Sequence, residues 1–250
     1  MIVTIKSFGQ PFYIGGNIGI GLNGSTIMAP SNTSYTGAAS SKSVFGGYTL
    51  NNKIISFEVA YSHIYSNYTG GGDVTYGAYS INRNRIIPTI KFMGKTSGSF
   101  YLKLGLVLDL QGVVQKEMLN MDFDNYLHYG APSSTYRADG FITAFTQGNV
   151  TPGYNWALGI NFRFIENASF FMEINNSAYH WSPTHTEVID GGGSDLSKYT
   201  IAQKQQNHVA NPVASSDPNQ PTEVPLQSYH FSNVGFNFGF IIHFGKKKDE

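Results

Sequence analysis

Large apolar residues occupy every second position of a segment near the C-terminus. They are Phe236, Phe238, Phe240, Ile242 and Phe244, and they alternate with Asn237, Gly239, Ile241 and His243. Successive side chains of a β-strand point to opposite faces, so this segment has one large apolar face and one face of mostly small or polar residues. Such a strand lies between two different media.

The same two-sided pattern recurs at residues 14–22, 100–110 and 156–164, and none of the four large-residue rows carries a charge. An amphipathic helix would need apolar residues at three- and four-residue spacing, which these segments lack. The alternation predicts an all-β fold, and the recurrence of uncharged rows indicates that the outer face of the sheet meets lipid.

We expect one domain, residues 1–250, that forms an eight-stranded antiparallel up-and-down transmembrane β-barrel with long extracellular loops. The strands are predicted at about 12–23, 43–50, 54–65, 79–92, 100–111, 154–164, 169–178 and 229–244. Short turns are predicted at Asn51, Lys95 and Glu166, and long loops at about 24–42, 66–76, 112–153 and 179–228. This asymmetry is typical of bacterial barrels and places both termini in the periplasm.

Three local features qualify this layout. Pro88 interrupts the fourth predicted strand, where a bulge or local defect is expected because proline cannot donate to the ladder. Thr186–Asp190 and Lys198–Gln203 flank three glycines and could pair as a hairpin above the membrane. Phe141–Gln147 could extend the sixth strand outward.

The composition favours a membrane barrel over a soluble, lipocalin-like ligand-binding barrel, which we keep as an alternative. Charged residues make up 13% of the chain, against about 25% in a typical soluble domain, and the smaller row is mostly Gly, Asn, Ser and Ala. The net charge is zero without a basic stripe, which excludes nucleic acid as an expected partner. The absence of cysteine excludes disulfides and thiolate metal sites.

Charged residues on the small row are predicted to face the lumen as a structural ion-pair network. They are Glu58, Arg83, Arg85, Lys91, Lys103, Asp109, Arg163 and Glu173. If Lys91 faces Tyr101 across the fourth hairpin, the same register sets Arg83 opposite Asp109. An eight-stranded barrel has room for side chains and none for an open channel, so these charges have to be paired.

Aromatic residues cluster where predicted strands meet loops, and they predict a girdle at the membrane interface. They are Tyr61, Tyr65, Tyr68, Tyr76, Tyr79, Trp156 and Tyr179. No catalytic, cofactor-binding or metal site is predicted. The spacing of His180, His185 and Glu187 matches no strong zinc pattern, and neither Asp122 with Asp124 nor Gly70–Asp73 follows a calcium loop.

The strand rows, the loop asymmetry and the terminal Phe244 resemble the small OmpA/OmpX-like outer-membrane β-barrels. The segments Arg85–Phe92 and Phe100–Leu106 look like barrel domains of Bacteroidota. The resemblance implies that Phe240, Ile242 and Phe244 form a C-terminal signal for the barrel-assembly machinery, although six residues follow Phe244 where many relatives stop. It also implies a bacterial outer-membrane location, with lipid and lipopolysaccharide as neighbours.

The sequence therefore favours a non-enzymatic outer-membrane barrel whose long loops serve binding or adhesion, membrane integrity, or an envelope complex with a protein partner. An outer-membrane lipid-modifying enzyme is the alternative, and it would need a hydroxyl–histidine pair near the outer leaflet or an acyl-chain cavity, neither of which the sequence places. Residues Met1–Gln10 lack the apolar core of a secretory signal, so we expect the numbering to begin on a mature or recombinant chain.

Overall fold

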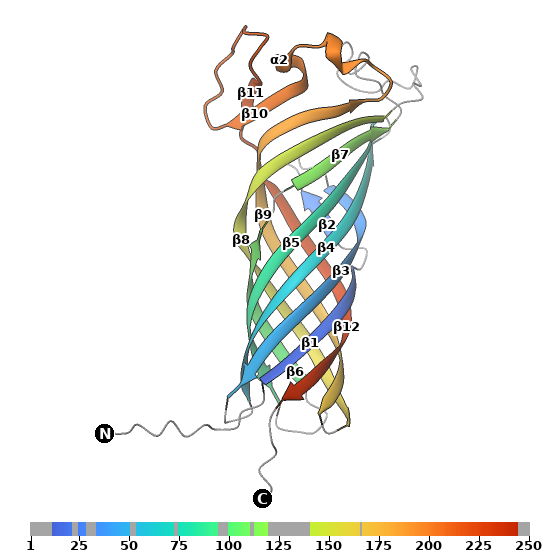
Figure 1. Cartoon of the computed structure of the whole chain (residues 1–250), viewed down its shortest axis with the longest axis vertical. Helices are drawn as coiled ribbons and strands as arrows, with labels where there is room; N and C mark the ends of the chain where they lie inside the picture. The colour runs from blue at the N-terminus through green and yellow to red at the C-terminus, as the bar shows by residue number, and fades with distance from the viewer. Residues whose placement is uncertain are drawn as a thin grey trace, which may run out of the picture.

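The structure, a computed structural model, is a tall barrel of tilted strands with a small cap above one end (Figure 1). It describes residues 12–21, 25–28, 34–50, 54–72, 75–94, 100–110, 113–119, 141–165 and 167–244. The predicted turn residues Asn51, Lys95 and Glu166 lie outside these ranges, as do Asp122, Asp124 and Asp73.

Eight antiparallel strands close into a ring, which confirms the predicted fold class. In ring order they are β1 (Phe12–Gly21), β3 (Ser34–Thr49), β4 (Ile55–Gly72), β5 (Thr75–Met93), β6 (Phe100–Asp109), β8 (Phe141–Ile165), β9 (Ala168–Gly191) and β12 (Tyr229–Phe244). The ring closes where β1 pairs with both β12 and β3. Full closure leaves no unpaired strand edge facing lipid, as a membrane-spanning sheet requires.

Two short strands continue the wall where β1 and β6 end. β2 (Ser25–Met28) pairs with β12 and β3, the two neighbours of β1. β7 (Val113–Leu119) pairs with β5 and β8, the two neighbours of β6. Each short strand therefore takes the place of its predecessor, and the wall stays closed above the point at which β1 and β6 end.

Most strands are longer than the sequence predicted, and this is the main correction to the layout. β8 has 25 residues and β9 has 24, so much of the predicted loops 112–153 and 179–228 belongs to the wall. The described residues of the predicted loop 66–76 are strand too, because β4 and β5 pair as far as Gly72 and Thr75; residues 73 and 74 lie outside the described ranges. Outside the lipid the outward face of a strand is no longer apolar, so the regular alternation that marks strands is lost while the ladder continues.

The cap, which we define as residues 192–228, follows β9. It contains η1 (Leu196–Lys198), α2 (Ile201–Lys204), β10 (Gln205–Val209) and β11 (Thr222–Pro225). The predicted pairing of Thr186–Asp190 with Lys198–Gln203 is wrong. Thr200 and Gln203 form a capping box that starts α2, and β10 is the segment that pairs with β9. Among the described residues, no helix is long and apolar enough to cross a membrane.

Pro88 leaves a gap in one ladder without shifting its register. β5 pairs with β6 at Ile86 and Leu108 and again at Thr89 and Gly105, while the two positions between are unpaired. The ladder on the other side, toward β4, is continuous through Pro88. The predicted local defect is therefore present, and it takes the form of missing pairs rather than an inserted residue.

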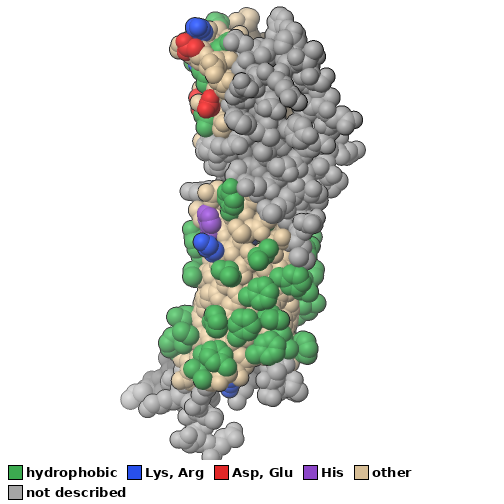
Figure 2. Space-filling model, turned by 90° about the vertical axis from the view of Figure 1, so that its right-hand side faces the viewer, with side chains coloured by type: hydrophobic (Ala, Val, Ile, Leu, Met, Phe, Trp, Pro, Cys, Tyr) green, Lys and Arg blue, Asp and Glu red, His purple; other side chains and the backbone are tan. Residues whose placement is uncertain are grey.

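A belt of exposed apolar side chains surrounds the barrel near the rim where β1 begins and β12 ends, which we call the terminal rim (Figure 2). Its rows run from Phe12 to Ile20 in β1 and from Phe236 to Phe244 in β12. These lengths match the about 9–11 residues that a tilted strand needs to cross a bilayer. Because the large apolar row points outward, the barrel has the reverse of the arrangement expected for a soluble lipocalin-like barrel.

Arginine at the middle of this belt should impair insertion. Leu106 is 55% exposed within the row Phe100–Leu110, and a lipid-facing arginine at mid-membrane costs about 2–4 kcal/mol. We expect Leu106→Arg to lose the gel shift between unboiled and boiled samples that reports a folded barrel. Asn149→Arg, at an exposed position of β8 above the belt, is the control and should insert normally. Equal insertion of both variants would show that the belt does not face lipid.

Candidate functional site

Two carboxylates and a lysine meet inside the barrel near the terminal rim. The Lys103 ammonium lies 2.8 Å from Glu58 Oε1 and 3.2 Å from Glu173 Oε2, and all three side chains are buried. Asn237 donates a further hydrogen bond of 2.8 Å to Glu173. Lys103 thus bridges two strands that are not neighbours in the wall, which ties β4 to β9 across the lumen.

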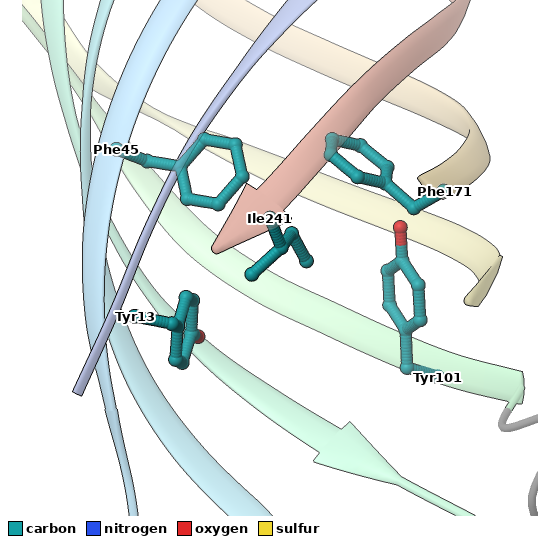
Figure 3. Close-up of a cluster of buried hydrophobic side chains, with 5 residues drawn as sticks. All are labelled: Tyr13, Phe45, Tyr101, Phe171 and Ile241. Atoms are coloured by element: carbon teal, nitrogen blue, oxygen red, sulfur yellow. The ribbon is translucent and has the colours of Figure 1, made fainter. Parts of the chain in front are cut away.

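Four aromatic side chains, those of Tyr13, Phe45, Tyr101 and Phe171, pack around this charged centre together with Ile241. We call these five residues, with Glu58, Lys103 and Glu173, the terminal plug. Figure 3 shows these side chains converging inside the barrel. Both tyrosines also donate to the carboxylates, Tyr101 to Glu173 at 2.9 Å and Tyr13 to Glu58 at 3.2 Å. The plug is therefore both an apolar seal and part of the hydrogen bonding of the buried charges.

A glycine stands directly across the strand pair from each aromatic ring of the terminal plug. Tyr13 is opposite Gly47 and Phe45 is opposite Gly15. Tyr101 and Phe171 face Gly159 and Gly239 in the same way. A Cβ at any of these glycines would collide with the facing ring. The glycines of the small row are what lets four large rings fit inside so narrow a barrel.

Lys91 completes the charge balance beside this centre. It stands opposite Lys103 in the β5–β6 ladder, and only 2% of it is exposed. Its ammonium lies 4.0 Å from the centroid of the Tyr101 ring. Two cations and two carboxylates thus occupy one region of the lumen. The ring face, whose quadrupole attracts a cation, stabilises Lys91, which forms no ion pair with a carboxylate in the part of the chain that the structure describes.

A second closure lies further from the terminal rim, around Arg83. Arg83 Nη1 is 3.0 Å from Asp109 Oδ2, and both side chains are fully buried. The guanidinium carbon also lies 4.9–5.6 Å from three ring centroids, those of Tyr179, Trp181 and Phe231. We call this group the upper plug. An ion pair within an aromatic cage blocks the lumen with a desolvated, paired charge.

A small polar cavity of about 50 Å³ lies in the lumen. Its lining includes Glu58 and Lys103 of the terminal plug, and also Arg85. Arg85 donates to Ser62 and Ser177 across the lumen, each at 3.4 Å. Asparagine and serine residues form half of the remaining lining. At this size the cavity accommodates a few water molecules and does not amount to a channel.

The structure thus brings together most of the predicted lumen residues, in a register different from the one expected. Lys91 is opposite Lys103 and Arg85 is opposite Asp109, so the assumed register was wrong by two residues. Arg83 still reaches Asp109, because a long side chain spans a diagonal cross-strand distance. Arg163 is separate from the others. It is exposed near the terminal rim and makes no ion pair with the residues that the structure describes.

The predicted aromatic girdle is correct only in part. Tyr61 and Tyr65 are exposed on the outer face of β4, as a girdle requires. Tyr179 was placed wrongly, because it is 6% exposed and belongs to the upper plug. The sequence gives no sign of this, since Tyr179 lies at an inward position of β9 beyond the segment in which alternation is visible. The side chains of Tyr68, Tyr76 and Tyr79 fall outside the described part of the chain.

The histidines do not assemble as their sequence positions suggest. His180 contacts His230 across the β9–β12 pair, whereas His185 contacts Asn207 and Glu187 contacts Gln205 of β10. No group of three metal-ligating side chains occurs among the described residues. Sequence reasoning missed the pairing of His180 with His230 because the two residues are fifty positions apart in the chain.

The outward apolar belt and the closed polar lumen define the architecture. The chain has the fold of a small outer-membrane β-barrel. No family model and no curated protein matches the sequence. Solved structures similar to this chain include the outer membrane protein OprG from Pseudomonas aeruginosa, at 12% identity and a TM-score of 0.46, covering 95% of this chain and 97% of that one. Neisserial surface protein A follows at 11% and 0.33, covering 93% and 97%.

Likenesses at this level are not a basis for assigning function. The fold instead follows from the strand pairing and the exposed belt of this chain. Neither similar structure supports the Bacteroidota assignment that the central hairpin suggested. What the barrel does has to be argued from its own lumen, wall and cap.

Removing the lysine of the terminal plug should be strongly destabilising. Lys103→Met leaves Glu58 and Glu173 buried beside each other without their cation, and breaking a buried pair costs about 3–5 kcal/mol. The measurement is equilibrium urea unfolding in lipid vesicles. Lys198→Met is the control, because its ion pair with Asp195 is exposed and such pairs contribute about 0–1 kcal/mol. If both variants unfold at the same urea concentration, the lumen pair is not what stabilises the barrel.

Attachment of the cap should weaken with acid. His208 bonds Thr186 of β9 at 3.0 Å. Burial lowers the pKa of His208 below the ordinary value of 6.5; the backbone carbonyl of Pro225, as a hydrogen-bond acceptor for the imidazole, opposes this shift, and repulsion by His185 adds to it. A depressed histidine pKa means that this stability is present above pH 6.5 and is lost as the pH falls below it. Hydrogen exchange, corrected for intrinsic rates, should show β10 losing protection between pH 7.5 and 5.5. In His208→Gln the same loss should be absent.

Proposed function

We propose that this protein is an integral outer-membrane barrel that works without catalysis and presents a binding surface outside the cell. The observation that carries the proposal is the length of β8 and β9, which have 25 and 24 residues and continue past the belt as far as Phe141 and Gly191. About 9–11 residues suffice to cross a bilayer. The added length therefore contributes nothing to crossing the membrane, and its effect is to hold the cap away from the lipid surface.

The position of the belt supports one orientation of the barrel in the outer membrane, with the terminal rim on the periplasmic side. Phe12 pairs with Phe244 at the terminal rim, and the short connections between β3 and β4 and between β5 and β6 return at the same rim. In such barrels the strands turn back close to the membrane on the periplasmic side and extend further on the outer side, as β4 and β5 do here before they connect. In the proposed orientation both termini lie in the periplasm, while the upper plug, the extended wall and the cap lie toward the outside.

Internal contacts give the cap a defined shape. Thr222 donates a hydrogen bond of 2.7 Å to the Ala202 carbonyl, and the Leu226 amide donates to Val209 at 2.8 Å. The Val213 amide donates to Glu223 at 2.7 Å, while the Val213 side chain is 69% exposed. A loop that only shielded the barrel mouth would not need such order. A fixed surface with exposed apolar side chains suits recognition of an extracellular or envelope protein.

The remaining partners follow from location. The belt would contact membrane lipid and, in the outer leaflet, lipopolysaccharide. Phe240, Ile242 and Phe244 lie exposed on the outward face of the last strand, where the barrel-assembly machinery would reach them before the ring closes. Recognition by that machinery is part of the proposal, and it agrees with the accessibility of these three side chains.

A lipid-modifying activity has weaker support. Ser169 Oγ lies 2.8 Å from His243 Nε2, but this pair is at the terminal rim rather than near the outer leaflet. The charged groups that act on His243 are Arg163 and Lys91, and both are cations. A general base needs a neighbour that stabilises the imidazolium as it forms, and two cations oppose that charge. The environment of this pair therefore favours a structural hydrogen bond.

Replacement of the cap tests the proposed function. Gly191 and Tyr229 are about 33 Å apart along β9, because Tyr229 pairs with Trp181 ten residues below Gly191. A Gly-Ser linker of about twelve residues spans this distance. In cells that lack the protein, we expect the shortened protein to insert as a heat-modifiable barrel and to fail to restore the lost phenotype.

The matched control is Asn149→Ala, a change on the exposed wall that leaves the cap intact and should restore the phenotype fully. If the shortened protein restores it as well as the control does, the cap is not the functional surface. A role of the barrel itself in membrane integrity would then be the better account.

A further inference from the structure

Two histidines face each other on the outer wall, above the belt. His180 of β9 and His230 of β12 are direct partners in the antiparallel ladder. Their Nδ1 atoms are 3.4 Å apart and their ring centroids 4.3 Å apart. The neighbouring Tyr179 and Phe231 point inward and are buried. The histidine pair therefore belongs to the outward row of both strands, where it is accessible from solution.

We propose that His180 and His230 form a binding site for a divalent transition-metal ion on the outer surface of the barrel. Imidazole nitrogen binds such ions at about 2.0–2.1 Å. An ion at that distance from both Nδ1 atoms of this pair would make an N–metal–N angle of about 110°, which suits tetrahedral coordination. The two ligands are thus already spaced for chelation, and a rotation of the rings that separates their centroids by about 1 Å would aim both nitrogens at the ion.

The strand pairing makes the site preorganised. A cross-strand pair is fixed by the backbone ladder on both sides, and this ladder runs without interruption from Tyr229 and Trp181 to Ile242 and Ala168. The ion would therefore meet two ligands whose main chains do not need to move. The same pairing makes the site depend on both strands, so loss of either histidine should remove chelation and leave a single weak ligand.

The ligand type and number limit which ion binds. Two imidazoles suit Cu²⁺, Ni²⁺ and Zn²⁺, and affinity for nitrogen sites is greatest for Cu²⁺ in this series. Calcium and magnesium prefer oxygen ligands and should not compete. Because no group of three ligating side chains occurs in the described part of the chain, the remaining coordination positions would be open to water or an external ligand.

The position of the pair places the ion at the membrane surface. Ile174 and Phe236 are the last apolar pair of the belt on these two strands, and the histidines lie six residues further along each strand. This is about 20 Å along the strand, or about 15 Å above the hydrocarbon once the strand tilt is included. A metal ion held there lies beyond the hydrocarbon and below the cap, in contact with the medium outside the cell.

The test is titration of the folded, tag-free protein in detergent with CuCl₂ at pH 7.5, followed by calorimetry and by electron paramagnetic resonance. Wild type should bind one Cu²⁺ with nitrogen hyperfine structure from two imidazoles. His180→Ala and His230→Ala should each weaken binding at least tenfold, and the double variant should also lose the weak binding by the one imidazole that each single variant keeps. Both single variants should keep the heat-modifiable gel shift, which separates a lost ligand from a lost fold.

His63→Ala is the matched control. His63 also lies on the outward row of a wall strand, but its ring contacts Asn84 rather than a second histidine, so the variant should bind Cu²⁺ as wild type does. Binding that survives either substitution in the pair would overturn the site. So would an equal loss in His63→Ala, because it would show that scattered single histidines account for the binding.

Discussion

The charged side chains inside the barrel have to be neutralised by one another, because lipid surrounds the wall and water has little room within. Lys103 lies between Glu58 and Glu173 in the terminal plug, and Arg83 is paired with Asp109 in the upper plug. Buried charges without partners would cost several kcal/mol each. Because Glu58, Lys103 and Glu173 come from strands on different sides of the ring, pairing these charges also fixes how the wall closes.

The aromatic rings and the glycines are linked to this electrostatic requirement. Rings reduce the access of water to the charges, donate tyrosine hydroxyls to the carboxylates and offer their faces to Lys91 and Arg83. They fit only because a glycine faces each large ring of the terminal plug. The glycines of the small row therefore allow the lumen to be packed. Insertion into the membrane depends on the other, lipid-facing row.

The sequence predicts the belt well because lipid requires every second residue of a spanning strand to be apolar and uncharged. The rows ending at Ile20, Leu110 and Phe244 meet this requirement. It predicts the lumen charges by the same parity. It fails above the membrane, where the outward faces of β8 and β9 are largely polar and the regular alternation that marks a strand is lost. Contacts such as Tyr179 with Arg83 or His180 with His230 depend on cross-strand register, which a single sequence does not specify.

The central claim is that two plugs close the lumen, and single-channel recording of the purified protein in planar bilayers tests it most directly. Wild type should give no steady conductance steps, and removal of one plug, as in Arg83→Ala, should leave the barrel closed because the terminal plug remains. Conductance should require loss of both plugs, as in Arg83→Ala combined with Tyr101→Ala and Phe171→Ala. Large, steady steps from the wild-type protein would contradict a closed lumen.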